Sequence, residues 1–394
     1  MDSHKLMIFS WEQCKLGDLG SIGMNKRIFK EQTSEVGEIP FYKIGTFGDS
    51  PDAFISRELF EEYKFKYPYP NIGDILISAS GSIGRTVEYK GYDEYFQDSN
   101  IVWLRHQGRI DNSFLKQFYM IVKWTGLEGS TIKRLYNKNI LDTTINLPSL
   151  LEQKKVGNFF KQLDEAITLH QRKLVQLKTL KQAYLQQLFP SDGEYVPKVR
   201  FANFNQDWEL CKVATMAKKT YGGGTPKTSV KEYWQGDLPW IQSSDLIVDN
   251  LKHVMPTKFI TQEAISKSAT KAIPKNSIAI VTRVGVGKLA LIPYSYATSQ
   301  DFLSLSLLNV DSYFGVYSLY KLLQNEINYI QGTSIKGITK GDLLEKSIKI
   351  PMDTVEQTGI GIFFNQLDEA ITLHQHKLES LNKLKQAYLQ KMFI

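Results

Sequence analysis

Cysteine is scarce in this chain, and features of secreted, membrane and metal-binding proteins are missing with it. The 394 residues include two cysteines, Cys14 and Cys211, which stand far apart and form no CxxC motif. This spacing argues against a disulfide framework or a zinc site and fits a reducing cytoplasm. The first residues contain no long apolar run, and no stretch reaches the length that spans a bilayer. We therefore expect no signal peptide, no membrane contact and no bound metal.

Several catalytic motifs are also missing. No GxxxxGK[ST] phosphate-binding loop occurs, and residues 285–288 are more typical of a hairpin turn. We find no Asn/Asp-Pro-Pro-Tyr/Phe tetrad of amino-methyltransferases. Asp52, Glu62 and Lys64 match the PD…ExK pattern of metal-dependent nucleases, in which two carboxylates hold Mg²⁺ beside a lysine. Residues 57–64 are, however, typical of an exposed helical turn, so a nuclease is the weaker alternative.

The overall composition is that of a globular protein with several domains and a basic surface. A chain of 394 residues with 42% hydrophobic residues suits two to four domains. The net charge of +7 favours a polyanionic partner without establishing one. No basic tail exists, so any contact with nucleic acid must come from a folded surface.

A duplicated segment organises the chain. Residues 157–189 return at residues 361–393 with a constant shift of 204, and 24 of the 33 aligned positions are identical. Apolar residues recur at alternating steps of four and three, which predicts that each copy is a helix packed lengthwise against another helix. At about 1.5 Å per residue such a helix is roughly 50 Å long. The expected partner of one copy is the other, running antiparallel.

The seam between these helices is predicted from the same spacing. His170 and His374 occupy equivalent seam positions and could form a pH-sensitive pair, but a hydrogen-bonded core histidine is the stronger interpretation than a metal ligand. Lys181 and Lys385 also fall on the seam, and Ala166, Leu180, Ala370 and Leu384 are expected to widen it. The predicted seam is Leu163, Ile167, His170, Leu174, Leu177, Tyr184 and Leu188, with Leu367, Ile371, His374, Leu378, Leu381, Tyr388 and Met392.

The duplication extends to the segments between the helices. Residues 11–15 correspond to residues 208–212, and residues 73–85 to residues 276–288. The two segments therefore share a fold, although most of their residues differ. We expect strands at residues 75–77, 101–104, 277–281 and 302–307, and short helices at residues 113–125 and 313–324.

The predicted fold class is α+β. Two mixed α/β domains are separated by two long antiparallel helices that form a coiled coil, and a pseudo-twofold internal repeat relates the halves. The expected boundaries are residues 1–150 for the first domain, 151–189 for the first helix, 190–207 for a linker, 208–354 for the second domain and 355–394 for the second helix. Two near-identical helices suit binding one partner twice, whereas two divergent domains suit reading two targets. A spacer of ~50 Å covers between one and two turns of B-DNA.

This order of domains and helices resembles type I restriction-modification specificity subunits. The resemblance rests on Tyr221-Gly-Gly-Gly-Thr-Pro226, on Tyr233-Trp-Gln-Gly-Asp-Leu-Pro-Trp240, on the Leu-Asp-Glu-Ala-Ile helices and on the duplication itself, and covers nearly the whole chain. It implies that each variable segment is a target recognition domain for one half of a split, asymmetric sequence in double-stranded DNA. The first half departs from the pattern, because it lacks both the Gly-Gly-Gly-Thr-Pro opening and the lead-in at residues 199–201.

The resemblance also implies the partners. The helices would set the gap between the half-sites and dock two methyltransferase (modification) subunits, through which restriction/translocase subunits join. It implies no catalytic residue and no cofactor on this chain; S-adenosylmethionine, ATP and Mg would be bound by the partner subunits. The setting would be the cytoplasm of a bacterium or archaeon.

Candidate DNA-reading residues are polar or basic residues on loops between the predicted strands. Arginine binds guanine N7 and O6, glutamine binds adenine, and lysine and serine hold phosphates. Each candidate has the alternative of being an ordinary solvated residue, and Trp240 is more typical of a core than of a base-stacking surface. The candidates are Ser80, Ser82, Arg85, Gln97, Lys133 and Arg134 in the first domain, and Thr225, Lys227, Gln242, Ser243, Arg283, Lys288, Gln300 and Lys336 in the second.

Two rival functions remain open from the sequence. One is the PD…ExK nuclease, and the other is a two-headed adaptor that binds proteins rather than DNA. Phosphate contacts make DNA binding fall steeply with salt, so binding that is insensitive to salt would favour the adaptor.

Overall fold

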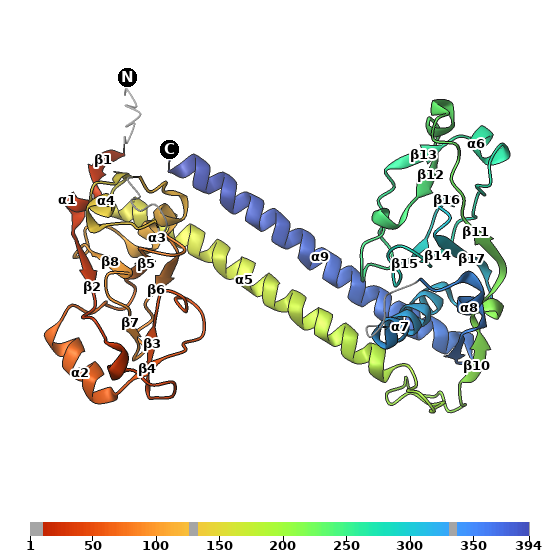
Figure 1. The fold of residues 1–394 in the computed structure, drawn as a ribbon, viewed down its shortest axis with the longest axis horizontal. Coiled ribbons are helices and arrows are strands. Elements are labelled where there is room, and N and C mark those ends of the chain that lie inside the picture. The colour runs from red at the N-terminus through yellow and green to blue at the C-terminus, as the bar shows by residue number, and fades with distance from the viewer. Residues whose placement is uncertain (1–10, 126–132, 331–336, 394) are drawn as a thin grey trace, which may run out of the picture. The chain divides into compact units, whose positions relative to one another are not determined.

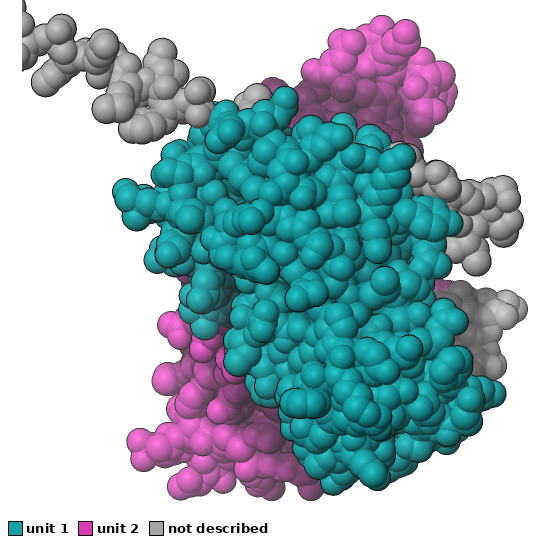
Figure 2. All heavy atoms as spheres, turned by 90° about the vertical axis from the view of Figure 1, so that its left-hand side faces the viewer, with its two compact units in different colours: residues 1–170, 377–394 teal, residues 171–376 magenta. Residues whose placement is uncertain are grey.

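The computed structural model describes residues 11–125, 133–330 and 337–393. They form two compact units, which Figure 2 distinguishes by colour. Unit 1 comprises residues 1–170 and 377–394, and unit 2 comprises residues 171–376. Each unit thus contains one α/β domain together with a part of each long helix.

The described residues of unit 1 form three small sheets. The order β2-β8-β5-β6 is antiparallel throughout, β4-β3-β7 is mixed because β3 and β7 run parallel, and β1 pairs with β9. The elements of the domain, most of them labelled in Figure 1, are β1 (Glu12–Lys15), α1 (Leu16–Leu19), β2 (Ser21–Met24), η1 (Lys30–Gln32), β3 (Ile39–Tyr42), β4 (Phe54–Ile55), α2 (Arg57–Lys66), β5 (Ile75–Ser78), β6 (Thr86–Glu88), β7 (Tyr95–Phe96), β8 (Ile101–Arg105), α3 (Asn112–Ile121), α4 (Asn137–Leu141) and β9 (Thr144–Leu147).

Unit 2 repeats this topology. Its sheets have the orders β11-β17-β14-β15, β13-β12-β16 and β10-β18, with β12 and β16 parallel. The predicted shared fold is therefore confirmed. The elements are β10 (Glu209–Lys212), η2 (Val213–Met216), β11 (Ala217–Gly222), η3 (Lys231–Trp234), β12 (Leu238–Ile241), η4 (Ser243–Asp245), β13 (Lys258–Ile260), α6 (Gln262–Ser266), β14 (Ser277–Val281), β15 (Leu289–Ile292), β16 (Ala297–Thr298), β17 (Phe302–Leu308), α7 (Ser312–Ile330), α8 (Lys340–Glu345) and β18 (Ser347–Ile350).

The predicted strands are confirmed, and the short helices differ from prediction in their ends. The strands lie at β5, β8, β14 and β17, and the run 285–288 is the turn between the antiparallel strands β14 and β15. Helix α3 ends at Ile121, earlier than expected, whereas α7 continues to Ile330. No Gly or Pro interrupts residues 325–330, so helix propensity allows α7 to continue.

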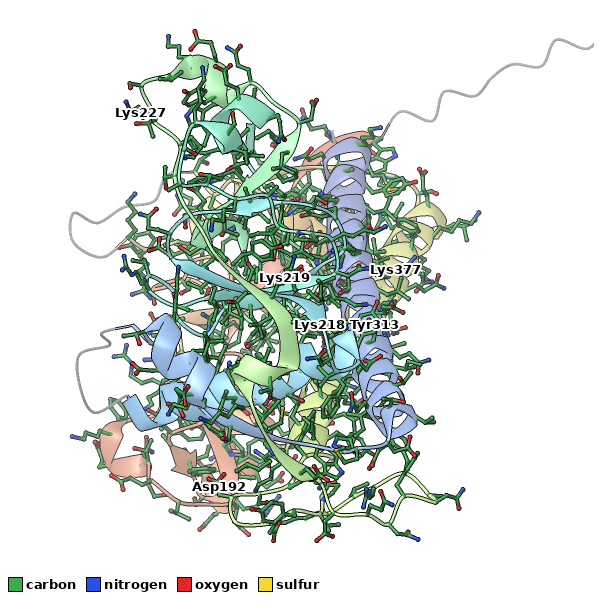
Figure 3. The ribbon with its side chains drawn as sticks, turned by 90° about the vertical axis from the view of Figure 1, so that its right-hand side faces the viewer. Asp192, Lys218, Lys219, Lys227, Tyr313 and Lys377 are labelled. Atoms are coloured by element: carbon green, nitrogen blue, oxygen red, sulfur yellow. The ribbon has the colours of Figure 1, made fainter. Side chains whose placement is uncertain are left out.

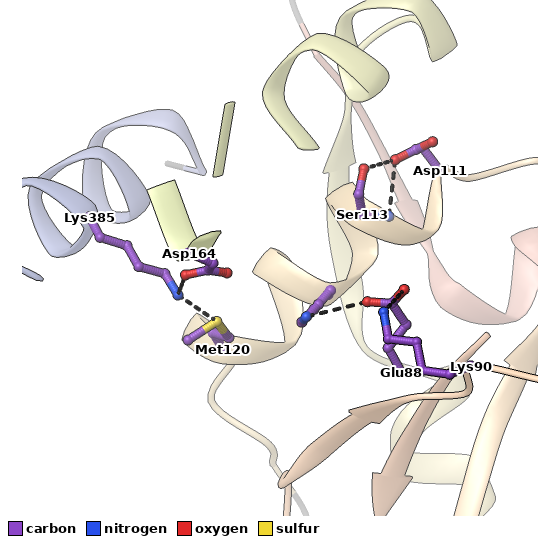
Figure 4. A network of polar contacts seen from close by, with 8 residues as sticks. Glu88, Lys90, Asp111, Ser113, Met120, Asp164 and Lys385 are labelled. Carbon is purple, nitrogen blue, oxygen red and sulfur yellow. Dashed lines mark hydrogen bonds and ion pairs between the residues drawn. The ribbon is translucent and has the colours of Figure 1, made fainter. Parts of the chain in front are cut away.

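The long helices are α5 (Leu150–Gln187) and α9 (Thr354–Met392), and they pack antiparallel within each unit. In unit 1 Lys385 Nζ lies 2.6 Å from Asp164 Oδ1 (Figure 4), and the ring of Phe159 contacts that of Tyr388. In unit 2 Lys181 Nζ lies 2.6 Å from Asp368 Oδ1. Within unit 2 the ring of Tyr184 also contacts that of Phe363. In each unit the number of the contacted residue on α9 falls as the residue number on α5 rises, so the two helices run antiparallel.

Burial along the helices follows the predicted seam at most positions. Leu163, Ile167, Leu188, Leu367 and Ile371 are buried; His170, Leu174, Leu177, Tyr184, His374, Leu378, Leu381 and Met392 are half-buried; Tyr388 is exposed. The expected widening through Leu180 and Leu384 is wrong, because these side chains are 41% and 42% exposed. Leu185 and Leu389 are buried instead, since α5 and α9 turn these positions towards the domains.

Each long helix crosses the start of a domain helix at a glycine. Asp111 caps α3 by accepting from the backbone N–H groups of Ser113 and Phe114, of which Figure 4 shows the first. Asp311 likewise accepts from Phe314 N–H. Gln153 and Gln357, at the starts of the long helices, accept from the backbone N–H of Asp111 and Asp311 respectively, at 2.9 Å in both cases.

The crossing explains why both copies keep a glycine inside a helix. A Cβ at Gly157 would overlap the Ser113 side chain, and one at Gly361 would lie 2.7 Å from Asp311 Oδ1 and 2.8 Å from Phe314 N. Glycine in a helix costs about 1 kcal/mol relative to alanine, so its presence here follows from the close approach of the two helices.

We expect Gly361→Ala to destabilise unit 2 and Gly359→Ala to stabilise it. The Cβ at position 361 would crowd the capped start of α7, and overpacking costs about 1–3 kcal/mol. At position 359, two residues away in α9, a Cβ would make only ordinary contact at 3.8 Å with Phe201. Chemical denaturation of both variants measures the difference, and equal effects would show that the crossing does not require glycine.

Candidate nucleic-acid interface

Both units build the same frame at the end of their central strand. After β5, Ala79 accepts at 2.8 Å from the backbone N–H of Leu135; after β14, Thr282 accepts at 2.9 Å from that of Ile338. The turn that follows β7 or β16 brings Gln97 or Gln300 to the same end. Loop residues that are distant in sequence therefore meet at one place in each domain.

In unit 2 a run of three glycines, residues 222–224, begins at the last residue of β11 and forms a turn at this place. A Cβ at Gly223 would overlap the carbonyl oxygen of Ser299, and one at Gly224 would lie 2.7 Å from the carbonyl carbon of Ala269. Gly224 also donates to Thr298 O and accepts from the indole N–H of Trp240, both at 2.9 Å. The glycines are therefore required by close backbone packing.

Hydrogen bonds then orient candidate side chains around the turn. Thr225 Oγ1 donates to Gln300 Oε1 at 2.7 Å, which leaves the Gln300 amide hydrogens as available donors. Lys288 Nζ donates to Ser243 O at 3.1 Å and so holds the β14–β15 turn against η4. Arg283 is exposed on the same turn.

Gln242 is linked to a lysine that the sequence reasoning missed. Lys258 Nζ donates to Gln242 Oε1 at 3.4 Å and lies over the rings of Trp234 and Trp240, at 5.8 and 5.5 Å from their centroids. Trp240 itself is buried, as predicted for a core residue. Lys258 was not detectable in the sequence, because only the pairing of β12 with β13 brings it to the tryptophans.

In unit 1 the corresponding candidates are bonded mainly within the domain. Gln97 Oε1 accepts from Ile44 N at 2.8 Å, and Arg85 Nη1 donates to Phe47 O at 2.8 Å. Arg134 Nη2 donates to Ser99 O at 3.1 Å, and Ser80 Oγ donates to Asn100 Oδ1 at 2.8 Å. These hydrogen bonds fix the conformation of the loops, and they orient the polar side chains that the loops carry.

The remaining candidates are more scattered. Ser82, Lys133 and Lys227 are exposed, and Figure 3 places Lys227 far from Lys218 and Lys219, two exposed lysines on the edge strand β11. Lys336 lies outside the described residues. Charged residues on an edge strand also discourage strand pairing with other chains.

The PD…ExK residues do not form a metal site. Asp52 pairs with Lys43 at 2.9 Å, Glu62 with Lys66 at 2.9 Å, and Lys64 with Asp93 at 3.5 Å. Each is thus engaged in a separate ion pair. Across residues 11–125, 133–330 and 337–393, no cluster of three or more His, Cys, Asp or Glu side chains could hold a metal ion.

Comparison with known proteins decides the family. The sequence pattern of the type I restriction modification DNA specificity domain matches twice, at residues 10–179 and 205–383. The chain belongs to this family. Its two matches coincide with the two halves of the internal duplication.

Individual relatives agree. A putative type I restriction enzyme specificity subunit of Haemophilus influenzae is 54% identical over 158 residues, 39% of this chain and 41% of that protein. The putative type I restriction enzyme MjaX specificity subunit of Methanocaldococcus jannaschii is 24% identical over 95% of this chain and 91% of its own length. The chain thus spans less than half of the first relative and most of the second.

Solved structures share the fold. The S subunit of a type I restriction-modification system from M. genitalium aligns with a TM-score of 0.65 and 14% identity over 99% of this chain and 98% of that one. The expected family, fold class and role as a specificity subunit are confirmed. Within the described part of the chain, no helix is long and apolar enough to cross a membrane.

We expect Gly223→Ala to unfold the glycine turn of this specificity protein. The added Cβ would overlap Ser299 O, and overpacking of this kind costs about 1–3 kcal/mol. Gly341→Ala, in α8, is the matched control, because its Cβ would meet only Thr339 Oγ1 at 3.9 Å. A thermal unfolding midpoint that falls for the first variant alone is the expected result; equal midpoints would contradict the packing described.

Proposed function

We propose that this subunit binds a split, asymmetric sequence in double-stranded DNA. Residues 1–150 would recognise one half and residues 208–354 the other, with residues 190–207 as the linker. The repeated loop frame with different side chains supports this: Arg283 occurs where the first domain has Ser80, and Lys288 where it has Arg85. One scaffold with two sets of polar groups suits two different half-sites.

Within this proposal, the oriented side chains are the readers. Gln300, held by Thr225, presents amide donors, and Gln97 does the same in the first domain. Amide groups pair with adenine and guanidinium groups with guanine in the major groove. Lysines such as Lys133, Lys227 and Lys288 would contact phosphates.

We further propose that residues 151–189 and 355–394 dock two methyltransferase subunits. The support is that identical apolar side chains are exposed at equivalent positions: Leu169 is 66% and Leu373 is 69% exposed. Two like surfaces suit two copies of one partner. Restriction/translocase subunits would join through the methyltransferases. S-adenosylmethionine would bind the methyltransferase, and ATP with Mg the translocase, in the cytoplasm of a bacterium or archaeon.

A methylation map tests this function. We expect DNA from cells that express the chain with its cognate methyltransferase to carry methylated adenines at one split, asymmetric motif. DNA from cells without the chain should lack them. An assembled complex that methylates no motif would contradict the proposal and favour the protein adaptor.

Helix length should set the gap between the half-sites. Four residues, about one helical turn, are deleted from each helix: residues 173–176 of α5 and residues 373–376 of α9. These two stretches face each other in the antiparallel register that pairs Lys181 with Asp368, and their removal spares Gly361 and the buried Phe364. The expected map shows the same half-sites with a changed gap, and an unchanged gap would reject the helices as the spacer.

A further inference from the structure

Two cations in unit 2, Arg283 and Lys340, lie near each other. Arg283 follows β14, and Lys340 is the first residue of α8. Among the residues that the structure describes, neither side chain forms an ion pair. In contrast, Lys212, Lys252 and Lys346 of the same unit each pair with a glutamate.

The backbone brings these cations together. Ile338 N–H donates to Thr282 O at 2.9 Å, and a Cβ at Gly337 would lie 3.2 Å from the Cα atom of Arg283. The chain that enters α8 therefore lies directly against the start of the β14–β15 turn. Thr339 caps α8 by accepting from Asp342 N–H at 3.1 Å, which fixes the backbone beside Lys340.

The Lys340 side chain extends to the glycine turn. A Cβ at Gly222 would lie 3.0 Å from Lys340 Nζ, so the ammonium group fills the space beside this glycine. Gly222 is exposed and immediately precedes the turn that presents Thr225 and Gln300. The ammonium group thus lies next to the candidate reading residues.

The surroundings do not stabilise the charge on Lys340. Burial lowers the pKa of Lys340, the positive charge of Arg283 lowers it further, and Asp301 opposes them only in part. Two like charges held together in this way are unfavourable in the free chain. An anion between them would relieve the repulsion.

We propose that Lys340 and Arg283 together hold one phosphate of the DNA backbone beside the Gly222–Thr225 turn. The inference rests on the proposed DNA binding and assigns Arg283 to anchoring rather than to base reading. Lysine serves as a point charge for phosphate, and arginine offers a fork of donors. The phosphate would fix the register in which Thr225 and Gln300 meet the bases.

The first domain lacks this pair. The positions that correspond to Arg283 and Lys340 at the constant offset are Ser80 and Asn137. Arg134 forms an isolated backbone β-bridge with Ser80 there. Its guanidinium is partly engaged, because Nη2 donates to Ser99 O. The anchoring pair therefore belongs to the second domain alone.

The test measures salt dependence in the complete complex. Full-length chain assembled with its methyltransferase is titrated with a duplex that carries the mapped motif, over a range of salt concentrations. Lys340→Gln should weaken binding and reduce the slope of log K against log salt by about 1. Arg283→Gln should do the same without relaxing the methylation motif, and the double variant should lose less than the sum of both, because they share one phosphate.

Two controls separate this role from a structural one. Lys212→Gln removes the same charge from a lysine that pairs with Glu345, at the other end of α8, and should leave the slope unchanged. Without DNA, Lys340→Gln should not lower the thermal unfolding midpoint, since its charge is unfavourable in the free chain.

The experiment distinguishes failure of the phosphate contact from failure of the proposed DNA binding. The affinity of the unmodified complex for its motif should fall steeply as salt rises. If it does, and the Lys340→Gln complex shows the same slope, the proposed phosphate contact is wrong while DNA recognition stands. A motif that relaxes at one base in Arg283→Gln would assign Arg283 to base reading and overturn the shared anchor. No motif for the unmodified complex would instead reject the proposed function.

Discussion

The reciprocal lysine–aspartate pairs between the long helices are the constraint on which the architecture depends. Lys181 of α5 pairs with Asp368 of α9, and Lys385 of α9 pairs with Asp164 of α5. These residues are equivalent in the two copies, so one antiparallel register satisfies both pairs. Lys181 is 5% exposed and also lies over the rings of Tyr317 and Tyr320. A buried pair of this kind selects a register, because slippage would leave a charge buried and unpaired.

The domains are joined to these helices by short-range contacts that the duplication preserves. Trp11 Nε1 donates to Glu152 at 3.2 Å, and Trp208 Nε1 donates to Glu356 at 3.4 Å. The second junction is reinforced by Arg200, whose Nε lies 2.6 Å from Glu356 Oε1. Each set of candidate DNA-reading loops is therefore carried by a domain that packs on its own part of the helices, while the loop sequences are free to differ.

The sequence predicted the repeated parts of the fold well. Identity between the copies disclosed the helices, and the offset of Ile75 and its neighbours disclosed the shared strands. The sequence did not predict which face Leu180 and Leu384 occupy, because the spacing of apolar residues does not show where the domains meet the helices. It also missed the role of Gly157 and Gly361, which depends on a crossing between segments that are distant in sequence.

The candidate interface was less predictable than the fold. Thr225 and Gln300 were both singled out, but their hydrogen bond depends on how the glycine turn packs on Ser299. Lys258 and Lys340 were missed because the residues that they contact belong to other strands and loops, which are separated from them in the sequence. Spacing within a strand or helix is visible in a sequence, whereas proximity between loops depends on the tertiary fold.

The most direct measurement is the methylation motif after residues 1–150 are replaced by the corresponding domain of another specificity subunit. Independent domains on a common helix pair predict that one half of the motif changes, while the other half and the gap stay the same. A change in both halves, in a complex shown to assemble, would contradict the assignment of one half-site to each domain.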